Sequence, residues 1–411
     1  MQRAIDAACN SHAPEGIDRF VSMYLRPGGQ AWPARRLMAG WQRRFETPGG
    51  LLSIDRFAPR DYLHHMAVSF EAESEGGVTR PTLLAVTNYH CTIKDVRRLT
   101  YSPDGMLAWL ELLSPAFEPV GVRHALNPPV PRVAGPSGVP VAIIDSGVNY
   151  TLPQIALRLA RDEHGHALGY DYWDMDARPF DAHPARSPFV IERHGTRIAS
   201  VVLREAPVAT IVPYRYPRPR MARMRTLVED AASQDVVIVN LSLVSTERKE
   251  WLAFEYAASQ HPDMLFVAAA GNFGRDLAAW PAYPAAFDLP NLIVATSSTR
   301  TGDLAEGANF GASQVDVMVP AVEVRAAGFD GIERAFSGSS YAAARLSALA
   351  ACLLSANPSW RAPELKRAIV ERAERQPRPF HVRFGFLSEG QLRVNESCPG
   401  RLVDIEPLQV E

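Results

Sequence analysis

The chain has 411 residues, of which 47% are hydrophobic and 21% are charged. This composition is ordinary for a folded globular protein and excludes a largely disordered one. The 43 Lys and Arg nearly balance the 45 Asp and Glu, so no overall field attracts phosphate backbones or anionic lipids. We therefore predict neither nucleic acid nor a membrane as a partner.

Cysteines are few, and no secretion signal is visible. The four, Cys9, Cys91, Cys352 and Cys398, are too sparse for a disulfide framework in a chain of this length, and no C-x-x-C pair suggests zinc. The first ten residues lack the apolar core of a signal peptide, and no run of 18 apolar residues occurs. We therefore predict a reducing, cytoplasmic location.

Residues 1–126 predict a small α+β domain with no catalytic signature. Its strand candidates are the apolar-rich runs 66–70, 82–86 and 106–113. Its candidate core aromatics are Trp41, Phe70 and Trp109. The Pro- and Gly-rich stretch 127–138 cannot be a continuous helix or central strand, because proline lacks the amide donor. We expect a linker there.

Residues 139–394 predict an α/β domain, followed by a C-terminal tail at 395–411. Short runs that are apolar throughout are typical of parallel strands covered by helices on both faces. These runs are 139–144, 208–212, 236–239, 264–268 and 292–295. The predicted helices are 196–204, 224–233, 250–260, 341–355 and 362–374.

Four polar residues lie at predicted strand ends or helix starts, where open parallel sheets bind ligands. Asp145 ends the first strand, His194 and Ser340 open helices, and Asn272 follows the fourth strand. Each alone could be a turn or a helix cap. Together they supply the orienting acid, base, nucleophile and oxyanion donor that acyl transfer requires.

Three segments resemble the aspartate, histidine and serine motifs of the subtilisin-like serine peptidases, in the family's order. They are Val-Ala-Ile-Ile-Asp-Ser-Gly-Val at 141–148, His-Gly-Thr-Arg-Ile-Ala-Ser at 194–200 and Gly-Ser-Ser-Tyr-Ala-Ala at 338–343. Further segments similar to the family are 240–243, 270–272, 309–311, 315–320 and 384–387. The resemblance covers about residues 138–393 and implies a three-layer fold with a mainly parallel sheet between helices.

The resemblance also implies roles for individual residues. His194 would be the general base, Asp145 its orienting partner and Ser340 the nucleophile, with the Asn272 amide and the Ser340 backbone amide binding the oxyanion. The residues implied to line the substrate cleft are Ser242, Leu243, Val244, Ala270 and Gly271.

The chain departs from the family pattern at a few positions, none of which removes a reacting group. Ser339 replaces the usual threonine before the nucleophile, Tyr341 the methionine after it, and Ala344 the helix proline, with Arg345 next. Val244 stands where glycine is common, so its side chain is expected to affect specificity.

We predict a serine endopeptidase acting on protein or peptide substrates, with selective processing of a cytoplasmic precursor as one form of that activity. The alternative is a catalytically silent binding or scaffold protein of the same fold. An α/β-hydrolase is excluded because Ser340 comes last in the chain and lacks the trailing glycine of Gly-x-Ser-x-Gly. The domain at 1–126 is either a propeptide or a retained accessory domain, and we favour the latter.

No cofactor or metal is required for this chemistry. The segment 171–181 carries four carboxylates, which could bind calcium or pair with arginines such as Arg178 and Arg193. The histidines His164, His166 and His183 are predicted to be surface residues rather than ligands, and the basic run 215–225 a solvated loop and helix start.

Overall fold

The computed structural model describes residues 1–73, 77–133, 137–375, 381–394 and 398, and it divides the chain into two compact units. The N-terminal unit comprises Met1–Pro128 together with Pro184–Ile191, and the second unit comprises Pro129–His183 and Glu192–Glu411. The predicted tail at 395–411, apart from Cys398, and residues 134–136 of the predicted linker lie outside the described residues.

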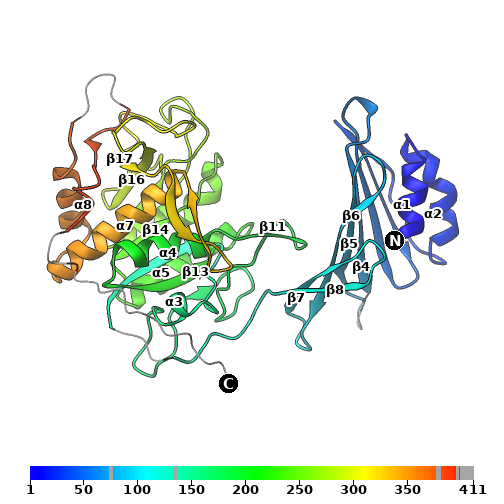
Figure 1. The fold of residues 1–411 in the computed structure, drawn as a ribbon, viewed down its shortest axis with the longest axis horizontal. Coiled ribbons are helices and arrows are strands. Elements are labelled where there is room, and N and C mark those ends of the chain that lie inside the picture. Colours follow the sequence, from blue (N-terminus) through cyan, green and yellow to red (C-terminus); the bar gives the residue numbers. More distant parts are fainter. Residues whose placement is uncertain (74–76, 134–136, 376–380, 395–397, 399–411) are drawn as a thin grey trace. The chain divides into compact units, whose positions relative to one another are not determined.

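The N-terminal unit is an eight-stranded antiparallel sheet with two helices on one face (Figure 1). Its helices are α1 Gln2–Cys9 and α2 Asp18–Tyr24, with the short 3-10 turns η1 Pro14–Ile17 and η2 Pro59–Asp61. Its strands pair in chain order: β1 Arg35–Leu37, β2 Gly40–Thr47, β3 Gly50–Phe57, β4 His65–Glu73, β5 Thr79–Thr87, β6 Ile93–Tyr101, β7 Leu107–Leu113 and β8 Pro119–Ala125. All three predicted strands are confirmed.

The core of this unit lies between the helices and the sheet. Alternate strand residues such as Phe45, Ile54 and Met66 pack against Ile5 of α1. Trp41 is buried at 3% exposure, as predicted, and Phe70 packs against the same core, whereas Trp109 is wrong as a core residue.

Trp109 is 36% exposed, with the Arg123 guanidinium 4.2 Å from its ring centroid. It lies on β7, beside the edge strand β8.

The four cysteines form two disulfides, against the prediction that they are too sparse for a disulfide framework. Cys9 at the end of α1 is bonded to Cys91 in the turn between β5 and β6, and Cys352 is bonded to Cys398. Sparse cysteines give no sequence signal for pairing, because pairing depends on proximity in the fold. The first disulfide spans 82 residues, a separation for which loss of chain entropy in the unfolded state stabilises by roughly 4 kcal/mol.

The second unit is an α/β unit, as predicted. Its sheet is parallel throughout, in the order β10-β13-β9-β14-β15-β16-β17-β20. The strands are β9 Val139–Asp145, β10 Tyr170–Asp171, β13 Ala209–Arg215, β14 Ile238–Leu241, β15 Leu265–Ala269, β16 Leu292–Ser298, β17 Val317–Pro320 and β20 Gly385–Phe386. A separate hairpin of this unit is β18 Val324–Ala327 with β19 Glu333–Phe336, whereas the hairpin of β11 His183–Ser187 and β12 Val190–Glu192 lies mostly in the segment 184–191 of the N-terminal unit.

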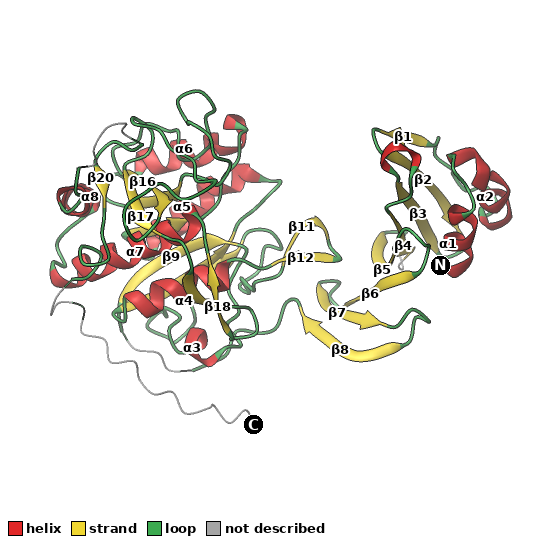
Figure 2. Ribbon diagram, turned by 45° about the horizontal axis from the view of Figure 1, so that its top comes forward, coloured by secondary structure: helices red, strands yellow, loops and turns green. Residues whose placement is uncertain are grey.

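Helices cover both faces of this sheet (Figure 2). They are α3 Pro153–Ala156, α4 Gly195–Glu205, α5 Met224–Ser233, α6 Leu252–Gln260, α7 Ser339–Ala356 and α8 Ala362–Glu371, with the 3-10 turns η3 Met221–Arg223 and η4 Arg248–Trp251. Helices α5 and α6 share one apolar cluster with alternate strand residues, while α4, α7 and α8 pack against strands from the other side. Every predicted strand and helix of this region is present.

Candidate active site

Three neighbouring strands bring the candidate residues to one edge of the parallel sheet. Asp145 ends β9, Ser242 follows β14, and Asn272 follows β15. Because β9, β14 and β15 are adjacent and parallel, their carboxyl ends meet at one edge. The starts of α4 and α7 supply His194 and Ser340.

Asp145 and His194 form a close pair. The imidazole Nδ1 lies 2.8 Å from Asp145 Oδ2 and 3.0 Å from Oδ1. Asp145 is 1% exposed, whereas the His194 side chain is 28% exposed. The carboxylate thus holds Nδ1 as the protonated nitrogen and leaves Nε2 free to accept a proton.

Burial and charge act on the pKa of His194 in opposite directions. Burial alone lowers that pKa, but the charge of Asp145 and its hydrogen bond outweigh burial, so the pKa is raised above the ordinary 6.5. The imidazolium that forms on proton transfer is therefore stabilised where it is needed.

Asp181 supports this pair and was not identified from the sequence as a site residue. Its buried carboxylate accepts hydrogen bonds from the Ser146 hydroxyl at 2.6 Å and from the His194 backbone N–H at 3.2 Å. It also accepts the backbone N–H of Thr196 at 3.0 Å and the Thr196 hydroxyl. Since His194 and Thr196 lie at the start of α4, their bonds to Asp181 fix the backbone that carries the His194 side chain. No local pattern marks it in the sequence.

Ser340 lies at the start of α7 and is half-buried. Its Oγ has one long contact, 3.5 Å to the carbonyl of Ser242, and the described structure has no hydrogen bond between it and His194. Ser339 is fully buried, and its Oγ accepts the Gly271 N–H at 3.0 Å. Of the two serines, only Ser340 therefore has an accessible hydroxyl.

The Asn272 side chain is oriented by the backbone of Ser339, the residue before Ser340. Its Oδ1 accepts the backbone N–H of Ser339 at 2.9 Å, which leaves Nδ2 as a free donor within the described structure. Asn309 holds the segment around it: its Nδ2 donates to the Ala270 carbonyl, and its Oδ1 accepts the N–H groups of Phe273 and Arg275. The amide donor is thus fixed beside Ser340 before any substrate binds.

The predicted cleft residues gather around the same edge. The Ser242 hydroxyl donates to Asn240 Oδ1 at 2.9 Å and lies 3.2 Å from the Ser340 carbonyl. Gly271 has φ +98°, and a Cβ there would lie 2.6 Å from Asn309 Nδ2, so the position needs glycine. The same Cβ would lie 3.5 Å from Val244 Cγ2, which places the Val244 side chain beside Gly271. Ala270 is buried, and Leu243 packs partly against the core.

Carboxylates of the acidic segment 171–181 form ion pairs with arginine rather than a metal site in the described structure. Arg215 Nη1 lies 2.7 Å from Asp171 and 2.7 Å from Asp174, and Arg215 is buried, which corrects the prediction of a solvated run at 215–225. Desolvation still raises the pKa of Asp171 to about 7. In the described parts of the chain, no group of three or more His, Cys, Asp or Glu is placed to hold a metal ion.

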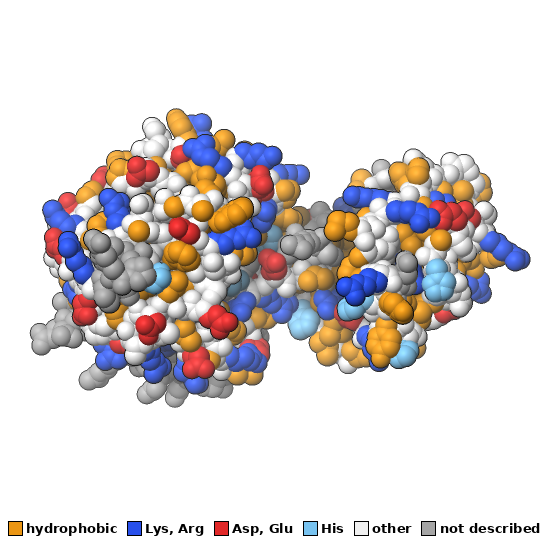
Figure 3. Space-filling view, turned by 90° about the horizontal axis from the view of Figure 1, so that it is seen from above, with side chains coloured by type: hydrophobic (Ala, Val, Ile, Leu, Met, Phe, Trp, Pro, Cys, Tyr) orange, Lys and Arg blue, Asp and Glu red, His pale blue; other side chains and the backbone are white. Residues whose placement is uncertain are grey.

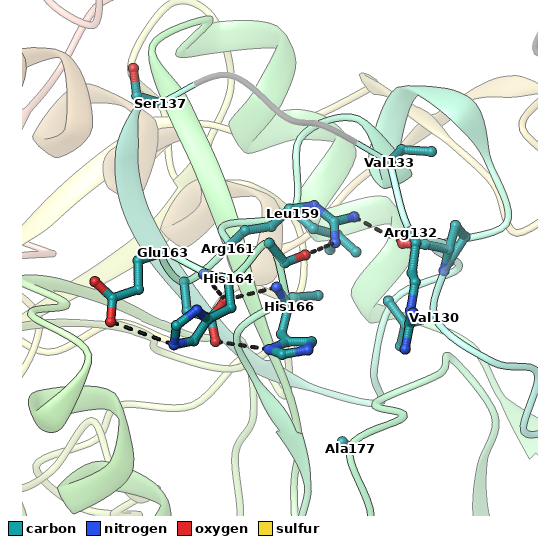
Figure 4. Close-up of a pocket in the computed structure, with 14 residues that line it drawn as sticks. Val130, Arg132, Val133, Ser137, Leu159, Arg161, Glu163, His164, His166 and Ala177 are labelled. Atoms are coloured by element: carbon teal, nitrogen blue, oxygen red, sulfur yellow. Dashed lines mark hydrogen bonds and ion pairs between the residues drawn. The ribbon is translucent and has the colours of Figure 1, made fainter.

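The three histidines predicted to be surface residues, His164, His166 and His183, differ in burial. His183 is buried, stacked on Tyr216 with ring centroids 4.3 Å apart, so its prediction as a surface residue is wrong. Burial, with the nearby Arg215 charge, lowers the pKa of His183 to about 3. His164 and His166 are exposed and line a hollow of about 740 Å³ opposite Val130 and Arg132 (Figure 4). None of the predicted catalytic residues lines it.

The distribution of charged side chains on the surface agrees with the near balance of acidic and basic residues in the sequence. On the face drawn in Figure 3, acidic and basic side chains are interspersed on each unit. No helix in the described residues is long and apolar enough to cross a membrane.

Comparison with known proteins gives a consistent result. A model of the subtilase family matches residues 136–386, more than half of the chain. A thermophilic serine proteinase of Bacillus sp. (strain AK1) is 27% identical over 255 residues, which are 59% of this chain and 58% of that protein. Thermitase of Thermoactinomyces vulgaris is 26% identical over 252 residues, 59% of this chain and 84% of thermitase.

A solved structure described as a lanthipeptide protease covers 62% of this chain and 86% of its own, with a TM-score of 0.51 and 18% identity. At that identity the likeness concerns the fold alone. The predicted three-layer fold is that of these proteins.

Proposed function

Because the chain belongs to the subtilase family of serine peptidases, we propose that it is a serine endopeptidase that uses Asp145, His194 and Ser340. The observation that carries this proposal is the buried Asp145 carboxylate within 3.0 Å of His194 Nδ1 by both oxygens. The donor side chain of Asn272 and the start of α7 lie at the same sheet edge.

The proposed reaction proceeds through an acyl-enzyme. Ser340 Oγ attacks the peptide carbonyl while His194 Nε2 accepts the hydroxyl proton, and Asp145 stabilises the resulting imidazolium. The Asn272 amide and the Ser340 backbone N–H bind the oxyanion. His194 then protonates the leaving amine, the C–N bond breaks, and a water activated by His194 hydrolyses the ester to release the acid and restore Ser340.

Ser340→Ala, compared with Ser339→Ala, tests the proposal. The wild-type protein should be labelled by a fluorophosphonate probe and cleave members of a peptide library detected by mass spectrometry. Ser340→Ala should lose both activities, whereas Ser339→Ala should still be labelled because only a structural hydrogen bond is removed. An unlabelled, inactive wild-type protein would favour the silent scaffold instead.

We further propose selective rather than general proteolysis. The Val244 side chain beside Gly271 narrows the predicted cleft, which supports a preference for small side chains there. A cytoplasmic precursor stays a prediction, and the two disulfides weigh against it, because disulfides persist mainly in oxidising compartments.

The N-terminal unit is proposed to be a retained accessory domain. It includes Pro184–Ile191, so the chain passes between the two units three times rather than once. Phe189 of this segment is buried, and its carbonyl accepts Arg97 Nη1 of β6 at 2.7 Å. A single cut in the stretch 127–138 would therefore leave the hairpin packed on the N-terminal sheet, which supports retention over release.

A further inference from the structure

Arg197 is a cation near the candidate catalytic histidine without a carboxylate partner. It lies on the first turn of α4, three residues after His194, and is partly exposed. Its guanidinium donates to the Arg193 carbonyl. Burial raises the pKa of Tyr341 to about 12, and the nearby Arg197 charge opposes that rise. Among the described residues, no Asp or Glu oxygen lies within ion-pair distance of the Arg197 or Arg193 guanidinium, whereas Arg204, Arg325 and Arg334 each pair with a carboxylate.

The carboxylates of the neighbouring β18–β19 hairpin are already used. Asp330 pairs with Arg334 at 2.7 Å, and Glu333 pairs with Arg325 at 3.1 Å. Each of these arginines thus neutralises an acid on its own hairpin. The positive charge of Arg197 remains available to an anion from outside the chain.

Aromatic rings support both unpaired arginines. The Arg197 guanidinium carbon is 4.8 Å from the centroid of Phe336, and that of Arg193 is 3.6 Å from the centroid of Phe329. Stacking on a ring engages the face of a guanidinium and leaves its N–H edge for a planar oxygen pair. The arrangement therefore orients the cation without neutralising it.

Ring contacts connect Phe336, which lies under Arg197, to the candidate catalytic residue His194. Phe336 stacks on Tyr341 with centroids 5.8 Å apart, and the Tyr341 ring lies 6.3 Å from that of His194. Tyr341 directly follows Ser340, so Arg197 lies at the outer end of an aromatic row that begins beside the imidazole. The row contains no competing anion within the described residues.

The position of the imidazole indicates which part of the substrate Arg197 meets. His194 protonates the leaving amine, so the leaving peptide must lie on the imidazole side of Ser340. The acyl part of the substrate lies toward Ser242 and Gly271 on the other strands. A carboxylate borne by the leaving peptide would thus approach Arg197.

We propose that Arg197 forms an anion-binding subsite that selects substrates with a carboxylate on the first or second residue after the scissile bond. The inference rests on the proposed peptidase function. The carboxylate can be an Asp or Glu side chain or the free C-terminus of a short leaving peptide. A charge-assisted hydrogen bond at a partly desolvated site gives a preference of about tenfold or more in kcat/KM.

Matched fluorogenic peptides test the subsite. They share one acyl side and carry Glu, Gln or Lys at the first or second position after the bond, with an amidated end. A second set has a neutral dipeptide as leaving group, with a free or an amidated C-terminus. The measured quantity is the ratio of kcat/KM between charged and neutral members of each set.

The wild-type protein should favour Glu over Gln, or the free over the amidated terminus, by about tenfold, and the set that responds identifies the source of the carboxylate. Arg197→Gln should bring that ratio to about one, and Arg197→Glu should reverse it toward Lys. Arg225→Gln is the matched control, because Arg225 is exposed, pairs with Glu229 on its own helix and, like Arg197, lies over an aromatic ring, that of Tyr256; its ratio should equal that of the wild type.

Salt dependence in the wild-type protein gives a second measurement that needs no variant. The preference for the carboxylate should weaken between 50 mM and 500 mM NaCl, because added salt screens the partly exposed cation. Equal cleavage of charged and neutral peptides by the wild type, or a preference that persists in Arg197→Gln, would overturn the subsite while leaving the peptidase intact. A wild-type protein that neither cleaves any peptide nor reacts with the probe would refute the peptidase and the subsite together.

Discussion

Two different substitutions of Asn272 test the roles of its side-chain oxygen and its side-chain nitrogen separately. Its Oδ1 accepts the Ser339 N–H at 2.9 Å, whereas Nδ2 has no acceptor within the described structure and is the proposed oxyanion donor. Asn272→Ala removes both groups. Asn272→Asp keeps an acceptor for Ser339 and replaces the donor by a negatively charged carboxylate, so the two variants distinguish a structural role from a role in the transition state.

The expected magnitudes follow from these contacts. Loss of one preorganised oxyanion donor costs about 10²–10³ in kcat, or about 2.7–4 kcal/mol, and both variants should show it. The exposed side chain makes one hydrogen bond to the protein. Asn272→Ala should therefore lose only about 0.5–1.5 kcal/mol of unfolding free energy, and Asn272→Asp less.

Steady-state kinetics on one fluorogenic peptide, with thermal unfolding of each variant, measure both effects. KM should stay nearly unchanged, because the donor acts on the transition state. Asn357→Ala is the control, since it removes an amide at the C-terminal end of α7, where Nδ2 donates to the Leu353 carbonyl. A kcat within about threefold of the wild type in either Asn272 variant would place the oxyanion hole elsewhere.

Three further outcomes are expected. The pKa of His194 is raised above 6.5, so acidification should protonate this base early, and the acid limb of kcat/KM should have its midpoint above pH 6.5. Asp145→Asn should move that midpoint lower. A wild-type midpoint below pH 6 would contradict this. Arg345→Met removes the buried cation that pairs with Glu205 and Glu389, although Arg204 still pairs with Glu205, and should cost about 1–3 kcal/mol in urea unfolding of the catalytic unit; no change in the midpoint would refute it. Intact-mass measurement should find wild type and Ser340→Ala equally full length, whereas a wild type shortened within 127–138 would establish self-processing.

The second unit could be predicted from local patterns. Its strands are buried on both faces, so each appears in the sequence as a solidly apolar run, and the helix 224–233 was predicted with its observed bounds. The candidate site residues Asp145 and Asn272 could be selected from the sequence because Asp145 ends one such run and Asn272 comes shortly after another. A residue at the end of a buried strand can be recognised in the sequence, because the apolar run that precedes it marks the strand.

Features that depend on distant contacts could not be predicted. Asp181 gains its role from donors at Ser146 and Thr196, which are 35 and 15 residues away in sequence. The burial of His183 depends on Tyr216, and each disulfide joins residues that only the fold brings together. Composition and periodicity contain no information on these pairings.

The departures in the serine motif are explained by contacts between α7 and α4. Near the start of α7, the Tyr341 ring stacks on Phe336, whose ring centroid lies 4.8 Å from the Arg197 guanidinium carbon on the first turn of α4. One turn later, Arg345 binds Glu205, the last residue of α4, at 2.9 Å. Helix α7 is therefore joined to both ends of the helix that follows His194. Since α7 also carries Ser340, these two contacts hold the proposed nucleophile relative to the proposed base through Tyr341 and Arg345, two of the positions at which the chain departs from the family pattern.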